Sequence, residues 1–147
     1  MKLNSIAIET SENVFHAQYQ NLSVTSDIVF ELIELMETKQ KTSRLCLHPS
    51  KESLVHQSLI VTSSKFQNNR HFHPDKFETI YPLHGQARLN LFDSRLNQIS
   101  SSLLSTDKTM SATIQPKEIH NFEILTETFA FLEVCPGPFT IHSTIYV

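Results

Sequence analysis

The spacing of hydrophobic positions changes once along the chain, from a helical period to a strand-like one. Between residues 25 and 42, apolar side chains recur every three to four positions, which is typical of an amphipathic helix. These positions are Ile28, Leu32, Leu35 and Met36. Ser26 or Asp27 can cap the first turn with a side-chain oxygen. We predict one substantial helix that packs as a lid on a sheet; the alternative is a helix that binds a partner.

From residue 44 onward, the chain becomes a series of short strands separated by polar or proline-containing turns. The candidate strands are 44–48, 55–63, 69–73, 77–83, 87–92, 98–104, 110–114, 120–125 and 129–134. We expect two hairpins, one joining 77–83 to 87–92 and one joining 87–92 to 98–104. A short alternating segment at 3–8 can form an edge or partner-exchanged strand. The pattern predicts a mainly β fold, a small antiparallel sandwich or barrel with one N-terminal α-helix.

The length of 147 residues suits a single domain. Within it, the pattern separates an N-terminal extension at 1–24, the helix at 25–42, the β-barrel at 43–139 and a C-terminal tail at 140–147. A net charge of −3 gives no basis for a nucleic-acid partner. An exposed sheet edge and long termini make a homodimer plausible.

The number and spacing of the cysteines, together with the hydropathy of the chain, indicate the cellular compartment. Cys46 and Cys135 lie far apart and form no Cys-x-x-Cys pair, so neither a zinc ribbon nor a disulfide scaffold is indicated. The first fifteen residues lack the uninterrupted apolar run of a secretory signal, and no stretch is long enough to span a bilayer. We therefore expect a soluble, cytoplasmic protein with no membrane partner.

The stretch HFHPDKFETIYPLHG at 71–85 carries the most informative chemistry. His71 and His73 are two positions apart, and on a strand such residues project from the same face. The Pro-Asp pair that follows favours a chain reversal, which would return Glu78 to the two imidazoles. Gly85, one of only two glycines, then suits a tight turn at positive φ. The alternative is a polar patch whose histidines are satisfied by backbone or water.

A fourth ligand is expected from a later strand, and His120 follows a proline turn in IQPKEIHNFEIL. Three neutral imidazoles and one carboxylate suit a borderline divalent transition metal: iron(II), manganese, nickel, cobalt or zinc. Such a set leaves at least one coordination position open, which separates a working metal site from a structural one.

These residues carry a resemblance to a known family. The motif residues of 71–85 match the first conserved motif of the cupin superfamily, and the segment around His120 resembles the second. The chain is more similar still to the cupin-fold metalloproteins of the WbuC type, in RLCLH at 44–48, HFHPDKFET at 71–79 and FLEVCPGPF at 131–139. The resemblance covers about residues 27–139. It implies a cupin barrel, also described as a double-stranded β-helix or jelly roll, that holds one divalent metal.

The chain departs from the family pattern at two places. A typical second motif reads Pro-x-Gly-x-x-His, whereas this chain has Gln115 and Lys117 where the proline and glycine would stand. His120 itself stays in register. Pro82 falls inside a strand that is usually aliphatic, and because proline lacks a backbone donor we expect a bulge or an edge position there.

Alternation along RLCLH places Arg44, Cys46 and His48 on one face of a strand. The WbuC-type resemblance favours the barrel interior for this face. There Arg44 could bind a carboxylate or phosphate and His48 could exchange protons near the metal. The alternative makes Arg44 a solvated charge and His48 a turn residue. His56, on the next strand, can share the substrate-binding face, and Cys46 is expected to be a small buried filler.

Three further residues are candidates for the cavity. Tyr81 and Arg88 could line it, and Tyr81 could bind substrate, although strand tyrosines and arginines are commonly rim residues. Glu133 lies in the otherwise apolar strand FAFLEV, where a carboxylate should face a polar cavity or solvent. If it is interior, it can act as a general base or orient a ligand histidine.

Two main hypotheses for function remain. In the first, the protein is an enzyme whose metal acts as a Lewis acid on a small polar or anionic substrate. The WbuC-type resemblance implies a sugar or nucleotide-sugar of bacterial surface-polysaccharide metabolism. In the second, the protein is a non-catalytic accessory or sensor that binds a small ligand or a metal. An iron-dependent oxygenase is a third possibility.

Overall fold

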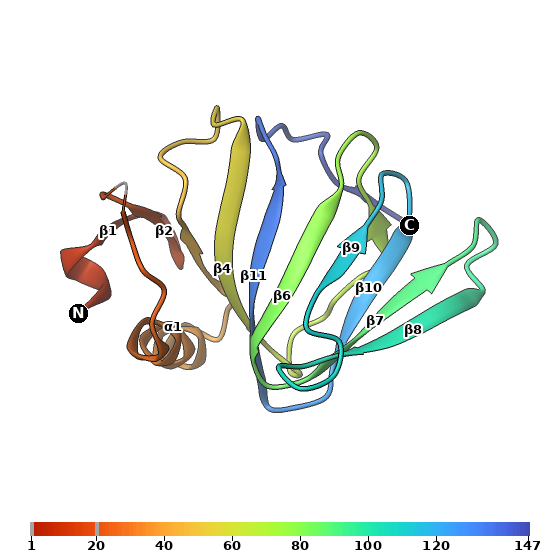
Figure 1. Ribbon diagram of the computed structural model, residues 1–147, viewed down its shortest axis with the longest axis horizontal. Helices are drawn as coiled ribbons and strands as arrows, with labels where there is room; N and C mark the ends of the chain where they lie inside the picture. The colour runs from red at the N-terminus through yellow and green to blue at the C-terminus, as the bar shows by residue number, and fades with distance from the viewer. Residues whose placement is uncertain (1, 20) are drawn as a thin grey trace.

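The fold is two facing β-sheets with one helix packed on the outside of the larger sheet (Figure 1). The computed structural model describes residues 2–19 and 21–147. Its elements are η1 (Leu3–Ser5), β1 (Ala7–Ser11), β2 (Val14–Ala17), α1 (Ser26–Lys39), β3 (Ser43–Cys46), β4 (Val55–Ser63), β5 (His71–Phe72), β6 (Glu78–His84), β7 (Ala87–Phe92), β8 (Gln98–Leu104), β9 (Ala112–Ile114), β10 (Ile119–Ile124), β11 (Thr128–Pro136) and β12 (Ile145–Tyr146).

The larger sheet has the strand order β1-β2-β3-β4-β11-β6-β9, and the smaller sheet has the order β12-β5-β10-β7-β8. Every pair is antiparallel except β2 and β3, which run parallel. The chain crosses repeatedly between the sheets, which gives a jelly-roll arrangement. The two sheets do not close into one continuous barrel. The predicted fold class, a mainly β jelly roll with one N-terminal helix, is confirmed.

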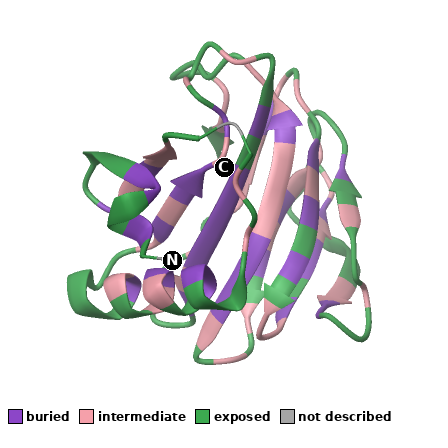
Figure 2. Cartoon of the chain, turned by 60° about the vertical axis from the view of Figure 1, so that its left-hand side comes forward, coloured by how far each residue is buried: buried purple, intermediate pink, exposed green. Residues whose placement is uncertain are grey.

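Helix α1 forms where the hydrophobic stripe predicts it. The cap is Thr25, one residue before the predicted candidates, and its hydroxyl accepts a hydrogen bond from Ile28 N. Gln40 ends the helix in the left-handed conformation. Buried and exposed positions alternate along α1 (Figure 2), as expected of a helix with one face on a sheet. Among the described residues, no helix has the length and apolar character needed to cross a membrane.

Two hydrophobic cores lie on opposite faces of the larger sheet. The first joins α1 and the N-terminal segment to the outer face, through side chains such as Leu32, Leu59 and Val61. The second fills the space between the sheets, through side chains such as Ile60 and Phe131. Because side chains alternate along a strand, β4 and β11 contribute to both cores. The space between the sheets is therefore where polar side chains on the inner face would meet.

One predicted hairpin is present and the other is wrong. Strands β7 and β8 pair as expected, with a register shift next to Phe92. Strands β6 and β7, however, belong to different sheets, so the tight turn at Gly85 is a crossover. Gly85 has the predicted positive φ, and a Cβ there would lie 2.1 Å from Thr128 O. The predicted irregularity at Pro82 is also present, as a register shift between β6 and β11.

The N-terminal strand was predicted in the wrong place. Residues 3–5 form a 3-10 helix, and the strands begin at Ala7 and form the hairpin β1–β2. The parallel pairing of β2 with β3 extends the larger sheet. The C-terminal tail also adds a short strand, since β12 pairs with β5. The sequence pattern indicated neither of these pairings.

Candidate metal centre

The four predicted ligands come together between the two sheets. His71 lies on β5, opposite His120 on β10. His73 follows β5, and Glu78 opens β6 on the facing sheet. The predicted return of the chain after Pro74 is therefore a crossing from one sheet to the other. It brings Glu78 to the imidazoles from across the interior rather than from a neighbouring strand.

The donor atoms are close enough to share one ion. One ligand atom from each of the four side chains lies within 4.8 Å of all the others. Oε1 of Glu78 is 2.9 Å from His73 Nε2, and its Oε2 is 3.4 Å from His120 Nε2. These approaches lack hydrogen-bond geometry, and both buried Nε2 atoms are without a hydrogen-bond partner in the described structure. An unpartnered buried nitrogen is costly, and a metal ion would satisfy both.

The second nitrogen of each ring is held by a main-chain carbonyl. The Nδ1 atoms of His71, His73 and His120 lie 2.9, 2.6 and 2.9 Å from the carbonyl oxygens of Asn69, Ser143 and Glu118, respectively. A carbonyl only accepts, so each Nδ1 carries the proton and each Nε2 presents a lone pair. This is the arrangement that orients histidines for metal binding.

Burial and charge shift the pKa values of His71, His73 and Glu78 in different directions. Burial lowers the pKa of His71. Burial also acts to lower the pKa of His73, but the adjacent Glu78 carboxylate outweighs it and the pKa of His73 is raised. Burial acts to raise the pKa of Glu78, yet contacts with His120 and His73 hold that pKa well below its usual range. Glu78 is therefore an anion at neutral pH and can serve as the carboxylate ligand.

Two adjoining cavities of about 290 and 190 Å³ open beside the cluster. They share Arg44, His71, Glu78, Glu133 and Tyr146. The larger cavity adds an aromatic wall that includes Phe122 and Phe131. The smaller one adds polar groups from His56, Ser58 and Lys76. A small polar ligand could therefore reach the metal position and contact both a cation and a carboxylate.

Arg44 and Glu133 face the interior, as the WbuC-type resemblance favoured for the Arg44 face. Arg44 Nη1 lies 4.0 Å from Glu133 Oε1, and the Glu133 side chain is only 14% exposed. Burial raises the pKa of Glu133, while Arg44 acts in the opposite direction. A buried carboxylate with a raised pKa beside a cavity is a candidate for proton transfer. The roles assigned to both residues stay predictions.

The other predicted residues are divided between the cavity and its surroundings. His56 lines the smaller cavity. His48 lines neither cavity; its ring stacks on His56 at 4.0 Å between centroids, and its Nδ1 lies 3.0 Å from Gln57 O. Tyr81 is 40% exposed and alternates with the buried Glu78 and Ile80, so it lies on the outer face of β6. The expectation that Tyr81 lines the cavity is wrong, because side chains alternate along β6 and the Tyr81 side chain points to solvent.

Sequence reasoning missed the contribution of the C-terminal tail. Tyr146 on β12 pairs with His71 and lines both cavities. Ser143 supplies the carbonyl that holds His73. Lys76, whose Nζ lies 3.8 Å from Cys135 Sγ, was also missed. The only signal in the sequence was the short apolar run at 145–147, which is too brief to predict a strand.

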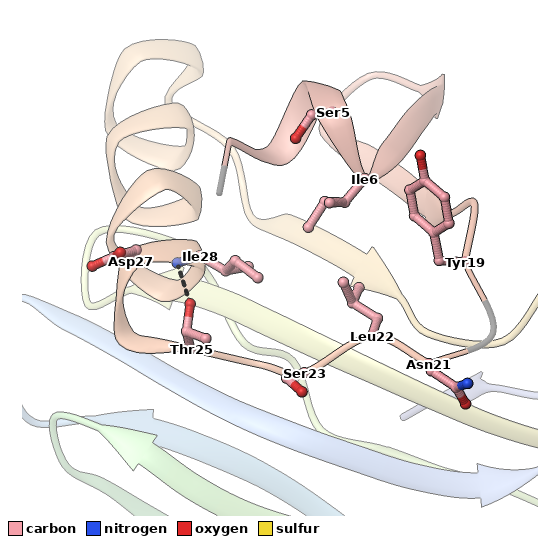
Figure 3. Close-up of a pocket in the computed structure, with 9 residues that line it drawn as sticks. All are labelled: Ser5, Ile6, Tyr19, Asn21, Leu22, Ser23, Thr25, Asp27 and Ile28. Carbon is pink, nitrogen blue, oxygen red and sulfur yellow. Dashed lines mark hydrogen bonds between the residues drawn. The ribbon is translucent and has the colours of Figure 1, made fainter.

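A separate cavity of about 490 Å³ lies between the N-terminal segment and the start of α1 (Figure 3). Ile6, Leu22 and Ile28 form an apolar lining, and Tyr19 and Asp27 lie at its edge. It contains no cluster of metal ligands among the described residues. We therefore place the chemistry at the His/Glu cluster and not in this cavity.

Comparison with known proteins bears on the fold. No protein-family model matches the chain, and no curated protein matches its sequence. Solved structures do match: the capsular polysaccharide assembling protein CapF from Staphylococcus aureus superimposes with a TM-score of 0.60 at 16% identity, over 72% of this chain and 31% of CapF. This chain has the cupin fold.

Oxalate decarboxylases share the same cupin fold. The Bacillus subtilis enzyme superimposes with a TM-score of 0.52 at 18% identity, over 65% of this chain and 24% of that one. The Lactobacillus farciminis enzyme, solved as a formate complex, gives 0.51 at 21% identity, over 65% and 27%. The Bacillus subtilis enzyme has Mn(II) centres. The chain spans between about a quarter and a third of the length of these cupin structures, so the similarity supports the fold and not their activities.

Proposed function

We propose that the protein binds one divalent transition metal and acts as a metal-dependent enzyme on a small anionic substrate. The observation that carries this proposal is the convergence of three imidazoles and a carboxylate beside a polar cavity. The fixed Nδ1–H tautomers and the unpartnered Nε2 atoms favour a metal over a hydrogen-bonded cluster. The Mn(II) centres of a neighbour with the same fold make manganese the first ion to test.

The residues that would hold the ion are His71, His73, Glu78 and His120. When bound, a divalent metal at this position supplies Lewis acidity to a substrate oxygen. The chain contributes orientation, because each imidazole is fixed by a main-chain carbonyl. It also contributes a low-dielectric environment, since the side chains of His73, Glu78 and His120 are no more than 6% exposed.

Substrate binding is assigned to Arg44 and proton transfer to Glu133. The Arg44 guanidinium is partly exposed and lies in the lining of both cavities, so it can bind a carboxylate or phosphate with two parallel hydrogen bonds. Glu133 lies beside it, and burial raises the pKa of its carboxyl, so we assign to it the transfer of a proton to or from the substrate. His56 can contact the substrate from the smaller cavity.

A sugar phosphate or nucleotide-sugar is the substrate class that we propose. CapF, which has the same fold, is a capsular polysaccharide assembling protein. The mixed lining, with Arg44 and Lys76 near an aromatic wall at Phe122, suits a ligand with both a charged group and a ring. Small carboxylates form the second class to test, because oxalate decarboxylases from two bacteria have the same fold.

The test is a turnover assay of protein loaded with Mn(II), Fe(II), Co(II), Ni(II) or Zn(II). Substrates are sugar phosphates, nucleotide-sugars and small keto and dicarboxylic acids. We expect turnover that is lost in Glu78→Ala and reduced in Glu133→Gln, with a raised KM in Arg44→Lys because lysine cannot bind an anion bidentately. Arg88→Lys, on the exposed Arg88–Glu123 pair, is the matched control.

Equal behaviour of wild type and Glu78→Ala would remove the enzymatic function for those substrates. Metal-dependent ligand binding without turnover would instead support the second candidate, a non-catalytic accessory or sensor protein. Oxygen uptake that requires Fe(II) and the metal ligands would support the third, an iron-dependent oxygenase.

A further inference from the structure

A second group of potential ligands lies on β2, β3 and the residues after β3. One ligand atom each from His16, Cys46 and His48 lies within 4.8 Å of the other two. His16 and Cys46 are direct partners in the parallel pairing of β2 with β3. His48 follows two positions after Cys46, so its side chain returns to the same side of the chain. Neither the proposed function nor the similarity to other cupin-fold proteins uses this group.

The hydrogen bonds of the two rings bear on which nitrogen can act as a ligand. The Thr10 hydroxyl is 3.3 Å from Val14 O, to which it donates, and 2.8 Å from His16 Nδ1. Nδ1 of His16 is then the donor to Thr10, and Nε2 keeps a lone pair. Nδ1 of His48 lies 3.0 Å from Gln57 O and also 3.1 Å from Gln57 N, whose N–H can donate to it. The tautomer that donates to the carbonyl has its lone pair on Nε2, whereas the tautomer that accepts from the Gln57 N–H carries the proton there. An ion at this position would select the first tautomer.

The surroundings also suit a bound ion. Cys46 and His48 are buried, whereas His16 is partly exposed, so an ion can enter from the His16 side. Ser58 Oγ donates to Cys46 Sγ over 3.9 Å. The stacked ring of His56 holds the plane of His48, with an interplanar angle of 9°.

We propose that His16, Cys46 and His48 form a second metal site, selective for a thiophilic ion such as zinc(II). Two imidazoles and one thiolate are a typical donor set for zinc, with a fourth position for water. In a tetrahedral site, donor atoms are roughly 3.3 to 3.8 Å apart. The 4.8 Å limit therefore requires only small side-chain rotations. His56 is a positioning residue, because it acts through His48.

Binding at this site releases one proton. A free cysteine thiol has a pKa of about 8.5, so without an ion it is mostly protonated at neutral pH. The ion replaces that proton, the sulfur becomes a thiolate ligand, and the proton passes to solvent. The bound ion would join β2 to β3 and to the segment after β3. It would thereby fix the N-terminal hairpin to the edge of the larger sheet.

Cobalt(II) is the probe that separates the two sites, because only this one contains sulfur. Metal-free protein under reducing conditions is titrated with Co(II), and thiolate-to-cobalt charge-transfer absorption is recorded in the near ultraviolet. We expect this band in wild type, and its loss in Cys46→Ser. Cys135→Ser, which changes the other buried cysteine, is the matched control and should retain the band. Zinc(II) added afterwards should displace the cobalt and remove the band.

His16→Gln provides a second test if Cys46→Ser folds poorly. His16 is partly exposed, so its replacement opens no internal cavity, and it should weaken the band while Glu78→Gln leaves it intact. The proposal is overturned if wild type shows no thiolate-to-cobalt band. It is also overturned if the band survives in Cys46→Ser or disappears in Cys135→Ser.

Discussion

At the scale of single residues, Lys117 shows how this chain forms the turn before His120 without the glycine that the cupin motif has there. Lys117 stands where the cupin motif has glycine, and it adopts a φ of 70°, in the left-handed region that glycine favours. Its backbone N–H donates to His73 O over 2.8 Å, and Gln115 N donates to Glu118 Oε2 over 2.7 Å. The turn before His120 is therefore kept in shape by hydrogen bonds, at a cost in backbone strain.

Replacing Lys117 with glycine should stabilise the protein. The substitution removes the left-handed strain of a residue with a Cβ, while glycine loses more entropy on folding. We expect a net gain of up to about 1 kcal/mol in the free energy of unfolding, measured by urea denaturation. Lys117→Ala is the control and should give no such gain. A destabilised Lys117→Gly would contradict the strain that we assign to this turn.

The buried His48 should make the stability of the protein depend on pH. Burial lowers its pKa to about 4 from an ordinary value of 6.5, so in this range the folded protein binds fewer protons than the unfolded chain. The arginine and histidines that face this ring, Arg44, His16 and His56, also lower the pKa. The contribution of His48 to stability is thus complete above about pH 6.5. It declines as pH falls and stops changing below about pH 4.

In metal-free protein, His48→Gln should remove this part of the pH dependence. We expect the free energy of unfolding of wild type to fall more steeply from pH 6.5 to 4 than that of the variant. The difference in slope is at most about 1.4 kcal/mol per pH unit. His142→Gln, at an exposed position, serves as the control. Parallel curves for wild type and His48→Gln would contradict the burial argument.

At the scale of elements, the C-terminal tail completes the candidate metal centre. Strand β12 pairs with β5, and Ser143 O accepts a hydrogen bond from His73 Nδ1. Both contacts act on histidines that would hold the ion. The tail is therefore a positioning element for these ligands.

Deleting residues 143–147 should weaken Mn(II) binding without unfolding the sheets. Loss of an outer hydrogen bond to a ligand histidine typically reduces metal affinity about 10- to 100-fold. Isothermal titration with Mn(II) measures the change, with Ile141→Ser as a control in the same tail at an 83% exposed position. An unchanged dissociation constant after the deletion would show that the tail does not position the ligands.

The sequence predicted elements with a strong local pattern and missed those that depend on distant partners. Three strands, 55–63, 87–92 and 98–104, have the predicted bounds, and α1 begins one residue after its predicted start. The spacing around His71 identified four side chains that do converge. Spacing could not show that β5 and β6 belong to different sheets, because a turn and a crossover look alike locally. Nor could it place Tyr146, which is next to His71 only after folding.

At the scale of the whole molecule, the fold determines which faces of the strands meet. The inner face of the larger sheet presents Glu133, Arg44 and Cys46, and the smaller sheet presents His71 and His120. The sequence indicated the site at His71, whereas the second cluster forms only because folding pairs β2 with β3 and brings His16 to Cys46. The homodimer expected from exposed sheet edges stays a prediction.

The central claim is that His71, His73, Glu78 and His120 bind one ion together. Manganese is the appropriate probe, since it prefers nitrogen and oxygen donors and should leave the thiol-containing cluster empty. The direct measurement is anomalous diffraction at the manganese edge from crystals grown with Mn(II). The account predicts one strong peak between the three Nε2 atoms and the Glu78 carboxylate. Manganese bound elsewhere, or no peak at the cluster, would contradict it.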